Sequence, residues 1–99
     1  MHVISRKKLV EFYGQAGHQD ARGPLEAWYY EAKHALWSSP ANVKDHYRSA
    51  SILKGNRVVF NIVGNKYRLV VRINYASETV FIRFMGTHKE YDKIDAETI

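Results

Sequence analysis

Cysteine is absent from this chain of 99 residues, and proline occurs only at Pro24 and Pro40. Without cysteine the chain can form neither disulfide bonds nor thiolate zinc sites, so its stability does not require an oxidising compartment. No segment approaches the roughly 20 apolar residues that a membrane-spanning helix needs. The first residues also contain no apolar run of signal-peptide length. We therefore expect a cytoplasmic protein that does not enter a membrane.

Sequence motifs for metal, nucleophile and nucleotide chemistry are missing as well. No two of the five histidines are two, three or four residues apart, so the hydrolytic zinc motifs are absent. A nucleophile elbow and a glycine-rich phosphate loop are not found either. We therefore expect no metal and no cofactor, and any catalysis must come from ordinary side chains. The histidines are His2, His18, His34, His46 and His88.

The chain does contain an excess of positive charge on a globular composition. There are 15 Lys and Arg residues against 10 Asp and Glu, the formal net charge is +5, and 45% of the residues are hydrophobic. This length fits one small domain over residues 1–99 with a single core. The positive excess lies between Lys44 and Lys93. It favours an anionic partner, with RNA, DNA, an acidic protein and a membrane surface all open.

Hydrophobic periodicity predicts an α+β domain with the order β-α-α-β-β-β and a short C-terminal helix or tail. Residues 2–4 read as a short strand at the sheet edge. Helical spacing predicts a first helix after Ser5, and a second helix that Asp20 caps and that continues past Leu36. A short third helix is expected over residues 41–47. The two long helices are expected to cover the apolar face of a twisted, mostly antiparallel sheet, leaving its other face available for a ligand.

The register of the three long strands follows from two tight turns, Gly64-Asn65 and Ala76-Ser77. Two-residue alternation then sorts the side chains by face. The pairs predicted to lie opposite each other are Asn61 with Arg68, Arg57 with Arg72, Phe81 with Arg72, and Arg83 with Val70. One face is predicted to carry Arg57, Asn61, Arg68, Arg72 and Arg83. The other is predicted to carry the apolar residues Val58, Phe60, Ile62, Tyr67, Leu69, Val71, Ile73, Tyr75, Val80, Ile82 and Phe84.

Four arginines on one sheet face repel one another, and an anionic partner would compensate for this repulsion. A solvated face is the alternative. The segment after the third strand, GTHKEYD, brings a His, a Lys and a Tyr to the end of the strand that carries Arg83. RNA cleavage by a 2′-hydroxyl needs a base, an acid and cations that hold the phosphorane charge. His88 suits either proton transfer, and Arg68 and Arg83 suit the phosphate oxygens. The alternative is a face that binds nucleic acid without cleaving it.

Several segments together resemble the HigB toxins, which are the toxic halves of type II toxin–antitoxin pairs within the RelE/ParE-like group. The most specific are VFNIVGNKYRLV and GTHKEYD, in this order after a short N-terminal strand. The resemblance covers nearly the whole chain. It implies a RelE-like fold and a metal-independent endoribonuclease, an mRNA interferase acting on translated mRNA in the ribosomal A site. It also implies a cognate helix-turn-helix antitoxin of the HigA type. The toxin would then contact operator DNA only as part of its complex with this antitoxin.

The resemblance also implies roles for single residues. Arg68 and Arg83 would hold transition-state charge, His88 would be general acid or base, and Tyr91 would position the nucleotide. The surrounding RNA-binding set would be Arg57, Asn61, Lys66, Arg72, Lys89 and Lys54. Two alternatives stay open: a ParE-like toxin that poisons gyrase, and an RNA-binding module without enzymatic activity. The His-Lys-Tyr cluster beside two arginines favours RNA chemistry, because a gyrase poison needs no acid–base group.

Overall fold

The computed structural model describes all residues from 1 to 99 and contains one five-stranded mixed sheet. Its strand order is β1-β5-β4-β3-β2, and β1 pairs parallel to β5 while all other neighbours are antiparallel. The predicted α+β class, the N-terminal edge strand and the mostly antiparallel sheet are thereby confirmed. The strands are β1 (His2–Ile4), β2 (Ser51–Ile52), β3 (Arg57–Ile62), β4 (Tyr67–Asn74) and β5 (Thr79–Thr87).

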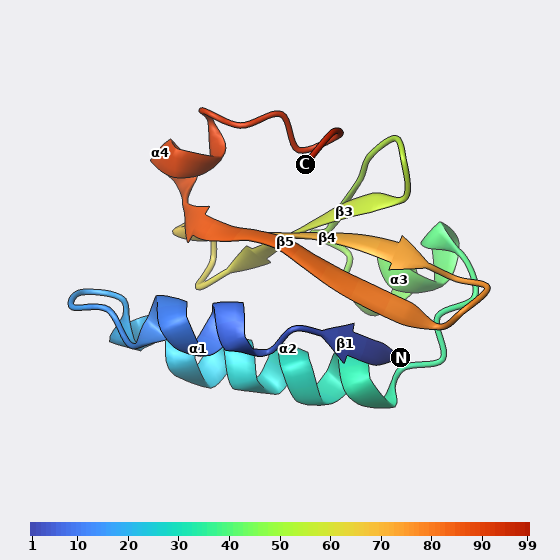
Figure 1. The fold of residues 1–99 in the computed structure, drawn as a ribbon, viewed down its shortest axis with the longest axis horizontal. Helices are drawn as coiled ribbons and strands as arrows, with labels where there is room; N and C mark the ends of the chain where they lie inside the picture. The colour runs from blue at the N-terminus through green and yellow to red at the C-terminus, as the bar shows by residue number, and fades with distance from the viewer.

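Two helices cover one face of this sheet, and the C-terminal residues lie on the other (Figure 1). The covering helices are α1 (Lys7–Tyr13) and α2 (Arg22–His34), the second preceded by a 3-10 turn at Gln19–Ala21. The short helix α3 (Pro40–His46) follows α2, and α4 (His88–Tyr91) follows β5 directly. None of the helices combines the length and the apolar character that crossing a membrane requires.

The main core lies between these helices and the apolar sheet face. Leu9 and Phe12 of α1 are buried there, together with Leu25, Trp28 and Ala32 of α2. Their spacing of three or four residues places them on one helical stripe, as the sequence predicts. Burying a large apolar side chain of this kind contributes roughly 1.5–3 kcal/mol. The sheet residues of the same cluster are Val58, Phe60, Ile62, Tyr67, Leu69, Val71, Ile73, Val80 and Ile82.

The predicted ends of the second helix were wrong. The helix ends at His34, and Ala35 is already extended with ψ 150°, so Leu36 leaves the apolar stripe and is 85% exposed. Asp20 does not cap the helix, because the 3-10 turn makes Ala21 the N-terminal cap residue. The Asp20 carboxylate instead accepts hydrogen bonds from Tyr67 and Lys66 of the sheet.

Most of the predicted strand register is confirmed. Asn61 lies opposite Arg68, and Arg72 lies opposite both Arg57 on β3 and Phe81 on β5. The pairing of Arg83 with Val70 was wrong, because β5 contains a bulge at this point and Val70 pairs with Phe84 instead. A bulge places two residues opposite one and shifts the alternation of all later side chains.

The bulge moves Phe84 to the sheet face opposite the helices, so the prediction that it lies on the helix-covered apolar face was wrong. Val59, Val70 and the C-terminal Ala96 form a second buried cluster on this face. The expectation that this face is open to a ligand was therefore wrong for its central part. Packed against the cluster are Leu53, Phe84, Tyr91, Ile94 and Ile99.

Candidate active site at the junction of β5 and α4

A capping box turns the chain abruptly from β5 into α4. The Thr87 hydroxyl accepts a hydrogen bond from the Glu90 N–H at 3.1 Å, and the Glu90 carboxylate accepts one from the Thr87 N–H at 2.8 Å. This second hydrogen bond holds the pKa of Glu90 below its usual value. The reciprocal bonds fix a helix of only four residues and so set the backbone position of His88, its first residue.

Arg68 and His88 are in direct contact at this junction. Arg68 lies on β4 opposite Gly86 of β5, and its Nη2 is 3.2 Å from His88 Nδ1. A guanidinium can only donate, so His88 Nδ1 accepts and a neutral imidazole carries its proton on Nε2. That Nε2 lies 3.5 Å from Asp92 Oδ1. The imidazole is therefore held between a cation and a carboxylate.

Tyr91 is the third member of this group and also contacts Arg68. The Arg68 guanidinium carbon lies 5.9 Å from the centre of the Tyr91 ring, within the range of a cation–π contact. Phe84 flanks the same ring at 6.4 Å between ring centres. Gly86 beneath them leaves no space for a side chain, since an added Cβ would lie 2.5 Å from the Phe84 ring. The structure thus brings together Arg68, His88 and Tyr91, three of the four residues predicted to be catalytic.

Arg83, the fourth predicted catalytic residue, lies apart from this group. It occupies the β5 bulge, is exposed, and has its guanidinium carbon 5.6 Å from the centre of the Phe81 ring. It also lines a shallow hollow beside Lys8 and Glu11 of α1. No hydrogen bond or ion pair joins Arg83 to Arg68 or His88.

Three of the predicted RNA-binding residues already have partners within the chain. Arg57 donates to the main-chain oxygen of Ile99 at 2.6 and 3.1 Å, beneath the C-terminal segment. Asn61 donates to the carbonyl of Ser49 at 3.3 Å. Lys66 lies 2.6 Å from the Asp20 carboxylate, which raises the pKa of Lys66 and lowers that of Asp20.

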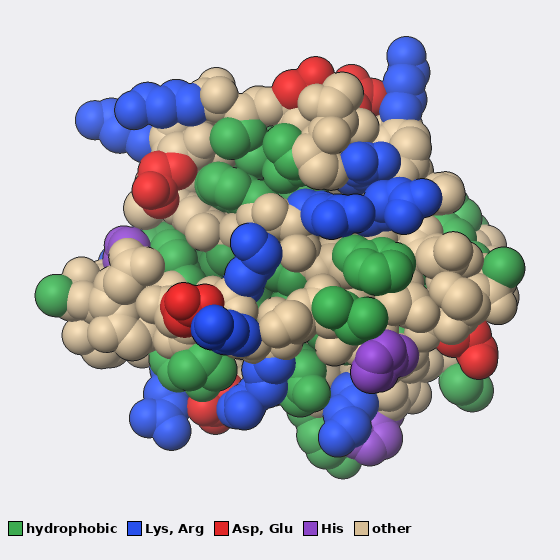
Figure 2. All heavy atoms as spheres, in the orientation of Figure 1, with side chains coloured by type: hydrophobic (Ala, Val, Ile, Leu, Met, Phe, Trp, Pro, Cys, Tyr) green, Lys and Arg blue, Asp and Glu red, His purple; other side chains and the backbone are tan.

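The other three predicted RNA-binding residues make no ion pair. Lys89 is exposed on α4 next to His88, Lys54 is exposed in the turn before β3, and Arg72 is half-buried on β4. Figure 2 shows Lys and Arg side chains projecting at the upper left, where Figure 1 places α4, and crossing the right half of the same face. Of these three, Lys89 lies next to His88, and its charge together with that of Arg68 gives the junction an affinity for anions.

Asp92 was not among the predicted site residues. Its spacing of four residues from His88 on a helical segment is the signal that indicates their contact. The Thr-x-x-Glu pattern of Thr87 and Glu90 is likewise a readable helix start, and it would have placed the expected C-terminal helix at His88. No three His, Cys, Asp or Glu side chains gather where they could hold a metal ion.

Comparison with known proteins places the chain in a family. Residues 21–94 match the family model of HigB_toxin, described as the RelE-like toxic component of a toxin-antitoxin system. The chain belongs to the HigB toxin family. The matched span includes β2 to β5 and α4, and therefore the whole Arg68–His88–Tyr91 group. A HigB toxin is one half of a pair, so the family also implies a cognate antitoxin.

Curated relatives match over most of their length. The mRNA interferase toxin HigB of Escherichia coli strain K12 is 29% identical over 94 residues, which cover 93% of this chain and 88% of the relative. The mRNA interferase HigB of Shigella flexneri matches to the same extent. The mRNA interferase HigB of Escherichia coli O6:H1 is 26% identical over 96 residues, covering 95% of this chain and 91% of the relative.

Proposed function

We propose that this HigB-family toxin is a metal-independent endoribonuclease that cleaves mRNA at the junction of β5 and α4. The observation that carries the proposal is the contact of Arg68 with His88, at 3.2 Å, beside the Tyr91 ring. Phosphodiester cleavage needs a cation that stabilises the charge on the phosphate oxygens and a group that transfers protons. A guanidinium next to an imidazole provides both. The relatives named mRNA interferases support RNA as the substrate.

The reaction is an internal transesterification. The 2′ oxygen of one nucleotide loses its proton and forms a bond to the adjacent phosphorus. The bond from phosphorus to the 5′ oxygen of the next nucleotide breaks, and that oxygen takes up a proton. The products are a 2′,3′-cyclic phosphate and a 5′-hydroxyl end. Arg68 binds the non-bridging phosphate oxygens and stabilises the charge that grows on them in the transition state.

His88 transfers one of the two protons, and to take up a proton its imidazole must release the Arg68 contact, because Nδ1 is its lone-pair nitrogen in that contact. Tyr91 presents its ring to the nucleotide next to the scissile phosphate, since bases of single-stranded RNA stack on aromatic side chains. Lys89 and Arg72 make no ion pair within the chain and hold the neighbouring phosphates. Lys54 and Arg83 extend the cationic surface on either side. Lys66, Arg57 and Asn61 contribute to RNA binding only if they leave their partners within the chain.

The proposed setting is the ribosome. A small toxin with one short cationic junction binds few nucleotides, and a ribosome would present a single codon in a fixed conformation. The substrate is then translated mRNA in the ribosomal A site. The proposed antitoxin has a helix-turn-helix domain, and the toxin reaches operator DNA only through that antitoxin.

The test is to induce the toxin in cells and map the new 5′ ends of mRNA. The expected result is growth arrest with 5′-hydroxyl ends inside translated codons, abolished by Arg68→Ala. Arg22→Ala is the matched control, because Arg22 lies on α2 and pairs with Glu26 at 3.0 Å in the helical layer. It should leave cleavage unchanged.

Other outcomes separate the alternatives. Cleaved DNA with an SOS response and intact mRNA would identify a gyrase poison. Salt-sensitive RNA binding without new ends, when the toxin, ribosomes and mRNA are mixed, would identify a binding module. New ends that carry 5′-phosphates would contradict the transesterification. Cleavage of naked RNA as fast as ribosome-bound mRNA would contradict the ribosomal setting alone.

A further inference from the structure

The strand β1 has one free edge, and that edge borders a wide hollow on the surface. β1 is the last strand of the sheet and pairs only with β5. Its His2 N–H donates to the carbonyl of Glu78, the residue just before β5. Successive residues of a strand turn their main-chain groups to opposite sides, so the N–H and C=O of Val3 point to the free edge. Such an edge is a template for another extended chain.

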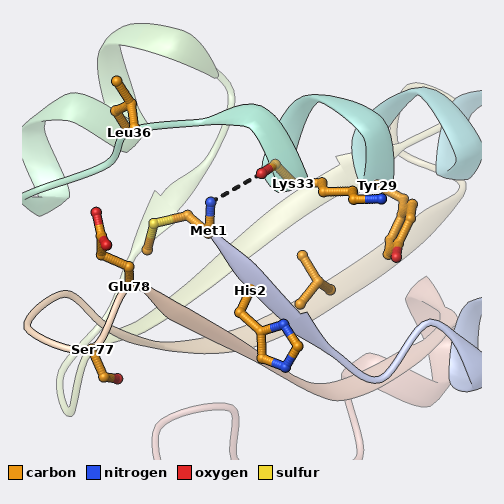
Figure 3. A pocket seen from close by; sticks show the side chains of 8 residues that line it. Met1, His2, Tyr29, Lys33, Leu36, Ser77 and Glu78 are labelled. Atoms are coloured by element: carbon orange, nitrogen blue, oxygen red, sulfur yellow. Dashed lines mark hydrogen bonds between the residues drawn. The ribbon is translucent and has the colours of Figure 1, made fainter.

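The hollow beside this edge, here called the β1 groove, has a volume of about 660 Å³. It is lined by His2 and Val3 of β1, Tyr29 and Lys33 of α2, Leu36, and Glu78 of the turn between β4 and β5 (Figure 3). The N-terminal amine of Met1 closes one side, donating to the carbonyls of Lys33 and Ala35 at 3.1 and 2.9 Å. The close-up shows Leu36 beyond the end of α2, separate from the other side chains.

Large apolar side chains are exposed at this groove and beside it. Leu36, which lines the groove, is 85% exposed, and Tyr30 on α2 is 65% exposed. A second hollow, lined by Arg6, Tyr30 and others, shares Tyr29 and Lys33 with the β1 groove. The two hollows therefore form one continuous surface. Exposed apolar side chains beside a free strand edge are typical of a protein interface.

The charges of the surface favour an acidic segment at one end. Arg6 and Lys33 make no ion pair, and Arg6 lies over the Tyr29 ring at 5.4 Å. Glu26 is already paired with Arg22. Glu78, at the far end of the groove, is the remaining acid of the lining. A partner that carries a carboxylate opposite Arg6 and Lys33 would be complementary.

We propose that the β1 groove binds an extended, apolar and acidic segment of the cognate antitoxin, which adds as a strand to the free edge of β1. This proposal rests on membership of a toxin–antitoxin family and is independent of the proposed nuclease activity. β1 pairs with residues 79–81 of β5, whereas Arg68 pairs with Gly86, five to seven residues further along the strand. At about 3.3 Å per residue, this separation is roughly 17–23 Å. The antitoxin therefore binds away from the Arg68–His88 contact and leaves it open.

The test measures binding of the toxin to the antitoxin from its own operon. Leu36→Glu and Lys33→Glu each change an exposed side chain of the groove and should weaken binding at least about tenfold. Ile52→Glu is the matched control, since Ile52 is 40% exposed on β2, the other edge of the sheet. Both groove variants should still arrest growth, and antitoxin co-expression should no longer rescue the cells. Thermal melting checks that all three variants fold.

Hydrogen exchange of the intact complex provides a second measurement. The Val3 amide should exchange slowly when the antitoxin is bound and faster in the free toxin. Unchanged affinity of both groove variants together with an unprotected Val3 amide overturns the proposal. Protection confined to α4 or to β2 overturns it as well. A toxin that forms a dimer through β1 in the absence of antitoxin assigns the groove to a second copy, and groove variants that lose RNA cleavage assign it to RNA.

Discussion

Arg68 Nη2 lies 3.2 Å from His88 Nδ1, although the two residues are 20 positions apart in the sequence. Arg68 belongs to the central strand β4 and His88 to the first turn of α4, so a rigid sheet and a capped helix hold the contact. In this contact Nδ1 accepts from Arg68, so the neutral imidazole carries its proton on Nε2. Asp92 Oδ1, 3.5 Å from Nε2, orients the imidazole from the other side.

The first prediction concerns this group of three. His88→Ala should lower the rate of ribosome-dependent cleavage about 10²- to 10⁴-fold, because one proton transfer loses its catalyst. Asp92→Asn should lower kcat less and leave KM nearly unchanged, since Asp92 acts as a positioning residue through His88. In the His88→Ala background, Asp92→Asn should have no further effect. Equal losses from Asp92→Asn in both backgrounds would show that Asp92 acts independently of His88.

A second prediction concerns Arg83, which the β5 bulge separates from Arg68. Because Arg83 is exposed and makes no contact with His88, Arg83→Ala should raise KM for the ribosome–mRNA complex and change kcat little. The effect should shrink at high salt, as expected for a screened surface charge. For Arg68→Ala we expect the reverse, a large loss of kcat and a smaller change of KM. A loss of kcat for Arg83→Ala as large as that for Arg68→Ala would return Arg83 to the catalytic group.

The sequence predicted the sheet well because alternation and turn residues are local signals. The pairs of Asn61 with Arg68 and of Arg57 with Arg72 follow from the position of one turn. The bulge could not be read in the same way, since Ile82, Arg83 and Phe84 alternate normally in sequence and only the pairing with β4 shows that Arg83 is extra. A single inserted residue was enough to move one predicted catalytic side chain away from the site.

The partners of the cationic residues depended on contacts between distant segments. Arg57 bonds to Ile99 and Lys66 to Asp20, across 42 and 46 positions of the chain. Neither pairing has a periodic signal in the sequence. Alternation alone predicts many cationic residues on one sheet face and does not say which of them act together. The resemblance to a toxin family singled out Arg68, His88 and Tyr91 from these candidates, and so this group could be predicted.

A third prediction tests the space beneath the active group. Gly86→Ala would place a Cβ 2.5 Å from the Phe84 ring and 3.0 Å from the Glu90 carboxylate, so the ring and the capping box must move. We expect a loss of about 1–3 kcal/mol in the free energy of unfolding, together with reduced cleavage because α4 is displaced. Gly23→Ala is the matched control, since its Cβ would have no neighbour within 4 Å. The control should leave cleavage unchanged, and a Gly86→Ala variant as active as wild type would show that the position of α4 is not critical.

A fourth prediction concerns the acid side of the stability curve. Lys66 and Tyr67 both donate to the Asp20 carboxylate at 2.6 Å, and they hold the pKa of Asp20 below its usual value of 3.8. A carboxyl group whose pKa is lower in the folded state stabilises the fold above its unfolded pKa, and this contribution disappears as the pH falls through its folded pKa. Asp20→Asn should therefore be less stable than wild type at neutral pH, and the difference should shrink below about pH 3.8.

Asp45→Asn, at an exposed position without a hydrogen bond or ion pair, is the control and should show no such dependence. Urea unfolding of all three proteins from pH 7 to pH 3 measures the difference, and a gap between Asp20→Asn and wild type that stays constant throughout would contradict the assignment.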